Sequence, residues 1–130
     1  TIIAEPGSAA VDAFLLSWTD AMWVSDFAAA EVASALSRLV RMGVLELDDA
    51  QGRLADFDAW RAAAASVVEI VSADVRLANA FVRRFNLMLR APDALHAAIC
   101  RRLELSLVTL DRRLAIAARE LGIDVAVPAG

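Results

Sequence analysis

Three acidic residues stand out because each lies near the start of an expected helix or just after an expected strand. Glu31 lies about a turn and a half into a predicted helix, and Ala28 and Ala35 precede and follow it on the same helix face. These small side chains leave room beside Glu31 for a metal ion or a phosphate. Asp93 lies in the first turn of another predicted helix, and Asp111 directly follows a predicted strand. Carboxylate oxygens are hard ligands, so these residues suit the binding of a divalent cation.

Each of these acids also has an ordinary structural explanation. Glu31 could be a solvated residue on a helix face. Asp93 could match the positive end of its helix dipole, an interaction worth roughly 0.3–1 kcal/mol. Asp111 could cap the helix that follows it, a role that aspartate fills well. The expected location favours a functional interpretation, because two strand ends and one helix start would meet at the same edge of a parallel sheet.

The composition indicates that any chemistry rests mainly on carboxylates. The chain has 130 residues, with a single cysteine, Cys100, and a single histidine, His96. One cysteine rules out an internal disulfide framework and favours a reducing compartment such as the cytoplasm. One histidine excludes a metal site built from several imidazoles. No stretch approaches the roughly 18 consecutive apolar residues of a membrane-spanning helix, so we expect no membrane insertion.

The charge balance is mildly acidic, with 17 Asp and Glu residues, 13 basic residues and a formal net charge of -4. Non-specific coating of nucleic acid needs clustered cations, so this balance argues against that class of protein. It does not exclude an enzyme that contacts nucleic acid locally. A carboxylate cluster that binds a divalent cation would itself make the formal charge more acidic than the working charge.

Hydrophobic periodicity predicts helices that alternate with short strands. The first predicted helix covers residues 6–18, and a short apolar run follows at residues 22–24. Ser25 is the expected N-cap of the next helix, and Gly43 is expected to end it. Strands are predicted for the β-branched run at 67–71 and for the runs at 105–110 and 124–127. Helices are predicted over 48–65, 74–85, 92–103 and 112–121. A capping box is expected at Asp48 and Gln51.

The alternation of helices and strands predicts the fold class. Strands separated by helices imply parallel pairing, with helices covering both faces of the sheet. Right-handed crossovers then favour one three-layer α/β/α domain over residues 1–130, with a mainly parallel central sheet. In such sheets the functional site lies beyond the carboxyl ends of the strands, so we expect it among the residues that follow Val24 and Val108.

Several stretches of the chain resemble a known family. Residues 89–98 (Leu-Arg-Ala-Pro-Asp-Ala-Leu-His-Ala-Ala) and 107–114 (Leu-Val-Thr-Leu-Asp-Arg-Arg-Leu) are similar to the C-terminal half of a PIN domain. More narrowly, they resemble the VapC-like toxins of bacterial type II toxin–antitoxin pairs. Residues 25–36 resemble the middle motif of that family, and Glu5-Pro6-Gly7-Ser8 resembles the opening of its first helix. The similarity covers nearly the whole chain, in order.

The resemblance implies a role for each of four residues. Asp93 and Asp111 would be metal ligands, and Glu31 would either bind the metal or orient the attacking water. Thr109 would be the hydroxyl that accompanies Asp111 and orients a carboxylate or a water. The implied activity is that of a Mg²⁺- or Mn²⁺-dependent endoribonuclease that hydrolyses RNA phosphodiester bonds. The implied partners are the RNA substrate, a cognate antitoxin and a second copy of the chain in a homodimer.

One departure from the family pattern leaves a second function open. The family opens with a short apolar strand that ends in an aspartate, and no such segment is found here. Asp12 and Asp20 lie inside and after the first predicted helix, so neither can substitute. We therefore expect a sheet that lacks its first strand, in a chain that is N-terminally incomplete. The second function is that of a catalytically inactive PIN-like binding domain, which acts through dimer or antitoxin contacts.

Overall fold

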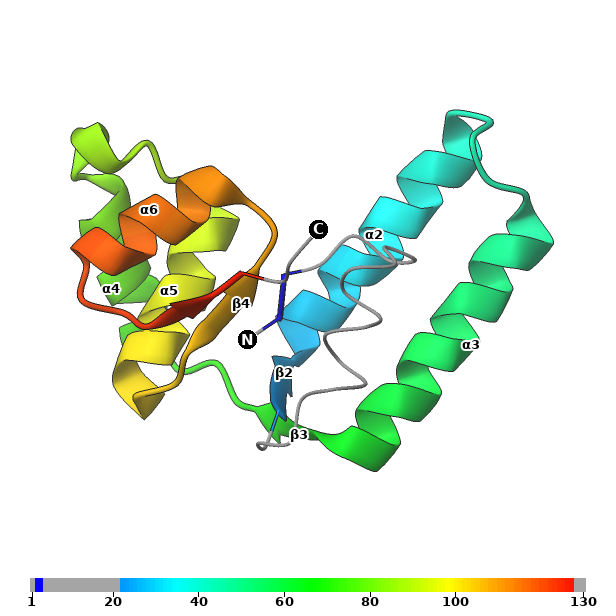
Figure 1. Ribbon diagram of the computed structural model, residues 1–130, viewed down its shortest axis with the longest axis horizontal. Helices are drawn as coiled ribbons and strands as arrows, with labels where there is room; N and C mark the ends of the chain where they lie inside the picture. The colour runs from blue at the N-terminus through cyan, green and yellow to red at the C-terminus, as the bar shows by residue number, and fades with distance from the viewer. Residues whose placement is uncertain (1, 4–21, 128–130) are drawn as a thin grey trace. The chain divides into compact units, whose positions relative to one another are not determined.

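The computed structural model describes residues 2–3 and 22–127. These residues fall into two compact units (Figure 1). The N-terminal unit contains residues 22–68, and the C-terminal unit contains residues 2–3 and 69–127. The helix expected over residues 6–18 lies outside the described residues.

The N-terminal unit combines a parallel pair of strands with two long helices. Strand β2 (Met22–Ser25) pairs in parallel with β3 (Ala65–Val68). Helix α2 (Asp26–Arg41) begins where β2 ends, and α3 (Leu47–Ala64) leads straight into β3. The core between the two helices is apolar, and its buried members are Val32, Leu36 and Ala50.

The two ends of α2 follow the local signals in the sequence. The side chain of Ser25 accepts a hydrogen bond from the backbone N–H of Ala28 at 3.0 Å, which confirms the predicted N-cap. After the helix, Gly43 has a φ of +72°, a left-handed conformation that suits glycine and confirms the predicted end. The capping box expected at Asp48 and Gln51 is wrong, because α3 begins at Leu47 and places Asp48 inside its first turn.

The residue range of β3 differs from the range predicted from the β-branched residues. The strand covers Ala65–Val68 rather than residues 67–71. Its four residues pair with the four residues of β2, so the length of the partner sets the length of the strand. Val68 is buried and Val67 is exposed, as expected for side chains that alternate between the faces of a sheet.

The C-terminal unit contains a parallel sheet in the order β1-β4-β5. Strand β4 (Leu107–Thr109) lies in the middle, with β5 (Val125–Ala126) on one side. On the other side, β1 (Ile2–Ile3) pairs with β4, which corrects the expectation that no strand precedes the first helix. A two-residue strand is too short for periodicity to reveal, but isoleucine favours strands and the edge of β4 offers unpaired backbone groups.

Three helices and a short 3-10 helix complete the C-terminal unit. Half of its core side chains are small, and Ala94, Ala97 and Ala98 of α5 are fully buried. These alanines let α5 pack closely against its neighbours. The four elements are α4 (Ser72–Val82), η1 (Phe85–Leu87), α5 (Ala91–Leu103) and α6 (Arg112–Glu120).

The parallel pairing confirms the predicted fold class, a mixed α/β fold that is compatible with the three-layer α/β/α arrangement, although the described strands form two sheets, one in each unit, and not a single central sheet. Helices dominate the described elements, and they separate β2, β3, β4 and β5 from one another along the chain. Within the described ranges, no helix has both the length and the apolar character that crossing a bilayer requires.

Candidate functional site

The end of β4 is organised by Thr109 and Asp111. Thr109 is fully buried, and its Oγ1 accepts the backbone N–H of Asp111 at 3.0 Å. Asp111 caps α6, because its Oδ1 accepts the backbone N–H groups of Arg113 at 2.9 Å and Leu114 at 3.2 Å. The carboxylate of Asp111 is therefore held in place while the residue stays exposed to solvent.

The capping role of Asp111 uses only one of its two carboxylate oxygens. Oδ1 takes both helix donors, and no hydrogen bond from a described residue reaches Oδ2. The ordinary explanation of Asp111 is thus confirmed, and it leaves the second oxygen able to bind a cation. A carboxylate at a helix N-terminus is also stabilised by the helix dipole.

Asp93 lies in the first turn of α5, which has a proline at its start and confirms the predicted helix start. Helix α5 contacts β4, and the connection between them covers only residues 104–106, so the two elements run in opposite directions. The first turn of α5 and the carboxyl end of β4 are therefore at the same end of this unit (Figure 1). This topology brings Asp93 and Asp111 to one end of the parallel sheet.

Glu31 lies on α2, in the N-terminal unit, and is half-buried. Ala28, three residues before it, is buried, whereas Ala35, four residues after it, is exposed. The alanines on either side thus lie in different environments. Because Glu31 belongs to a different unit from Asp93 and Asp111, its convergence with them stays a prediction.

Within residues 2–3 and 22–127, no three His, Cys, Asp and Glu side chains gather in a group that could hold a metal ion. The candidate oxygen donors at this end of the C-terminal unit are Asp93, in the first turn of α5, and Asp111, just after β4. Mg²⁺ keeps several of its waters and is commonly held by one or two carboxylates together with substrate phosphates. Two hard carboxylates at one sheet edge therefore fit a hydrated divalent cation.

The histidine and the cysteine of this chain pack inside the C-terminal unit. His96 is 0% exposed and Cys100 is 1% exposed, and both lie on α5. A packed helix histidine was the simpler expectation for His96, and its burial confirms it. Asp93 and Asp111 therefore remain the candidate metal-binding residues of this unit.

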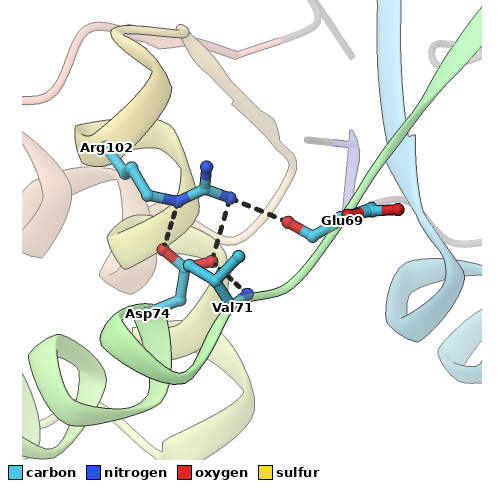
Figure 2. A network of polar contacts seen from close by, with 4 residues as sticks. All are labelled: Glu69, Val71, Asp74 and Arg102. Carbon is cyan, nitrogen blue, oxygen red and sulfur yellow. Dashed lines mark hydrogen bonds and ion pairs between the residues drawn. The ribbon is translucent and has the colours of Figure 1, made fainter.

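A buried acid that sequence reasoning treated only as a helix start is the centre of a polar network. Asp74 is 1% exposed, and its carboxylate accepts bonds from Arg102, from Nε at 2.7 Å and from Nη2 at 3.1 Å. The backbone N–H of Val71 also donates to Asp74 at 3.0 Å, and Nη2 of Arg102 reaches the carbonyl oxygen of Glu69 at 2.7 Å (Figure 2). This network ties the start of α4 to the end of α5.

The network also shifts the pKa of Arg102. The hydrogen bond to Asp74 raises the pKa of Arg102 above its ordinary value, and the negative charge of Asp74 acts in the same direction. An arginine is protonated at physiological pH in any environment, so the raised pKa reflects the attraction within the pair and not a change in the charge of the guanidinium. No local pattern could have indicated this pair, because 28 residues separate its members.

A second cation is placed at the carboxyl end of β2. Arg61 of α3 donates from Nη2 to Oδ1 of Asp26 at 2.7 Å and to the carbonyl oxygen of Val24 at 3.3 Å. Its Nε is buried and has no hydrogen-bond partner among the described residues. Arg61 therefore joins the last turn of α3 to the β2–α2 junction, five residues before Glu31 in the sequence.

Comparison with known proteins finds a matching family model and a solved structure with a similar fold. The family model for the PIN domain matches residues 2–120. No curated protein matches the chain. Among solved structures, the chain is similar to PAE2754 from Pyrobaculum aerophilum, with a TM-score of 0.57 and 22% identity over 78% of this chain and 68% of that one. At this level of identity, the similarity shows the fold alone.

Proposed function

The chain belongs to the PIN domain family, a nuclease-type fold whose members are generally metal-dependent ribonucleases, and on that premise we propose that it is the toxin of a type II toxin–antitoxin system. Its activity would be that of a Mg²⁺- or Mn²⁺-dependent endoribonuclease that hydrolyses RNA phosphodiester bonds. The supporting observation is the position of Asp93 and Asp111, two carboxylates at one end of the same parallel sheet. Ligands bind at this edge in open parallel sheets.

Asp93 and Asp111 are the residues that would hold the cation, with Glu31 as the predicted third acid. A bound divalent cation would lower the pKa of a water, orient it for in-line attack and neutralise charge on the phosphodiester. Thr109 would help to position Asp111 for this role, because its Oγ1 accepts a hydrogen bond from the backbone N–H of Asp111 at 3.0 Å. Glu31 would either bind the cation or orient the attacking water.

The composition of the first strand favours a second candidate. β1 itself consists of two isoleucines, so no carboxylate lies within the described strand, and the residues that follow it lie outside the described part of the chain. A PIN-like domain without that acid could keep its fold and bind partners without cleaving RNA. In this alternative the chain is a catalytically inactive binding domain that acts through dimer or antitoxin contacts.

The partners in this proposal are RNA, a cognate antitoxin and a second copy of the chain, all in the cytoplasm. The segment that joins α2 to α3 supports the existence of a protein partner. Met42 and Val44 of this segment, and Leu47 at the start of α3, expose 59%, 66% and 57% of their surface. Neighbouring exposed apolar side chains suit the rim or core of a larger protein–protein contact, to which other parts of the surface would also have to contribute.

The deciding experiment is cleavage of a panel of structured, labelled RNAs by the full chain in Mn²⁺ and in EDTA. Asp93→Asn removes one proposed ligand, and Asp124→Asn is the matched control. Asp124 is an exposed acid that precedes β5, at the opposite end of the parallel sheet. We expect Mn²⁺-dependent cleavage that Asp93→Asn lowers by more than about 100-fold and Asp124→Asn leaves unchanged.

Two results would contradict the nuclease proposal. Equal cleavage by the wild type and Asp93→Asn would assign the activity to another site or to a contaminant. No cleavage in Mn²⁺, combined with retained binding of an antitoxin, would favour the inactive binding domain.

A further inference from the structure

The turn between α4 and α5 exposes an aromatic ring among arginines. Phe85, the first residue of η1, is 82% exposed, and Met88, which follows η1, is 63% exposed. Arg84 and Arg90 on either side of them are also exposed. We call Arg84, Phe85, Met88 and Arg90 the η1 patch.

The outward direction of Phe85 is built into the turn. The neighbouring Leu87 and Leu89 are buried in the core of the C-terminal unit, and their packing holds the turn in place. The backbone N–H of Met88 donates to the carbonyl oxygen of Phe85 at 3.1 Å, and Met88 adopts a left-handed φ of +54°. Burial of a phenylalanine ring stabilises a fold, so folding alone does not explain why Phe85 is exposed.

The segment that contains the η1 patch is positively charged, whereas the whole chain is negatively charged. Residues 83–90 contain three arginines and no acid, although the chain carries a net charge of -4. Arg83 donates to the side chain of Asn79 at 3.1 Å. Arg84 and Arg90 make no side-chain hydrogen bond or ion pair with any residue that the structure describes. Both guanidinium groups are therefore available to an external anion.

We propose that the η1 patch binds single-stranded RNA, with a base stacked on Phe85 and neighbouring phosphates held by Arg84 and Arg90. An aromatic ring beside arginines is the arrangement by which proteins hold unpaired bases and their backbone. The inference rests on the proposed ribonuclease function and specifies where the substrate is held outside the carboxylate site.

The position of the patch favours RNA over a protein partner. Arg90 is the N-cap of α5, and Asp93 follows in the first turn of that helix. A strand of RNA bound at the patch would thus extend toward the carboxylate that is proposed to hold the cation. A stable protein interface needs an apolar area larger than the two exposed apolar side chains of this turn provide.

Binding of a labelled single-stranded RNA to the full chain, measured by fluorescence anisotropy in EDTA, tests the inference without requiring cleavage. Phe85→Leu removes the ring and keeps an apolar side chain, and we expect it to weaken binding about five-fold or more. Phe85→Trp keeps a stacking surface and should bind like the wild type. Ile116→Ala, which alters another exposed apolar side chain of the same unit, is the matched control.

The arginines are tested through the salt dependence of the same binding reaction. Arg84→Gln and Arg90→Gln should each weaken binding and lower the slope of log K against log salt by about 0.7. Arg119→Gln, which removes an exposed arginine from the last turn of α6, should leave the slope unchanged. Thermal melting of each variant shows that the loss of binding is not a loss of folding.

The outcomes separate this inference from the proposed function. RNA affinity that is unchanged in Phe85→Leu, Arg84→Gln and Arg90→Gln overturns the inference, even if the wild type cleaves RNA. The same holds if these variants lose affinity only for an acidic antitoxin peptide, which would assign the patch to a protein. Weakened RNA binding in the three variants supports the inference, and the cleavage assay in Mn²⁺ then tests the nuclease activity separately.

Discussion

Arg102 donates to both carboxylate oxygens of Asp74, from Nε at 2.7 Å and from Nη2 at 3.1 Å. The pair joins the last turn of α5 to the first turn of α4, and Asp74 is almost completely buried (Figure 2). Helix α5 carries Arg102 at one end and Asp93 at the other. The pair therefore holds in place the helix that presents a proposed metal ligand.

Replacement of Asp74 tests how much this pair stabilises the C-terminal unit. Asp74→Asn keeps the shape of the side chain but removes the charge that Arg102 and the N–H of Val71 contact. Loss of these bonds in a buried position should lower the free energy of unfolding by about 1–3 kcal/mol. Urea denaturation of Asp74→Asn and of the exposed control Asp124→Asn measures the difference, and equal midpoints for Asp74→Asn and the wild type would contradict it.

Substitutions of Asp111 separate its capping role from its proposed metal role. Asp111→Asn keeps an acceptor for the N–H groups of Arg113 and Leu114, so stability should change by less than about 0.5 kcal/mol. Cleavage in Mn²⁺ should fall more than about 100-fold, because the amide is a poorer cation ligand. Asp111→Ala should lose the same activity and about 1 kcal/mol of stability as well.

Full activity in Asp111→Asn would show that Asp111 is only a helix cap. Thermal melting and the RNA cleavage assay, performed on the same preparations, give both readouts.

Thr109 is predicted to act through Asp111 and not on the substrate. Thr109→Val removes the acceptor of the Asp111 N–H and should cost about 1 kcal/mol of stability. Because Asp111 itself remains, activity should fall about 10- to 100-fold, less than in Asp111→Asn. Thr109→Ser restores the hydroxyl and should recover the activity, and a failure to recover would show that the threonine methyl group matters instead.

Glu31 is tested by the dependence of cleavage on Mn²⁺ concentration. Glu31→Gln should lower activity at least about 10-fold without unfolding the chain, since Glu31 is only half-buried. A higher Mn²⁺ requirement would identify a metal ligand, whereas a lower rate at saturating Mn²⁺ would identify a residue that orients water. Glu46→Gln, an exposed glutamate before α3, is the control, and wild-type kinetics in Glu31→Gln would exclude Glu31 from the site.

The sequence predicted those features that depend on neighbours along the chain. Ser25 and Asp111 cap helices through backbone donors two or three residues away, and Gly43 ends α2 in a left-handed conformation. The start of α5 near Pro92 follows from the fixed backbone of proline. The positions of Asp93 and Asp111 on their elements were therefore predictable, because each depends on only one turn of helix or one strand end.

Only the tertiary structure decided which side chains are buried and what they contact. Phe85 points outward while Leu87 and Leu89 point inward, although all three are apolar residues of one short segment. Asp74 finds its partner in Arg102, far along the chain, and β3 ends where β2 has no further residue to pair with it. These outcomes depend on which elements pack together, and a pattern that covers a few neighbouring residues carries no information about contacts between distant segments.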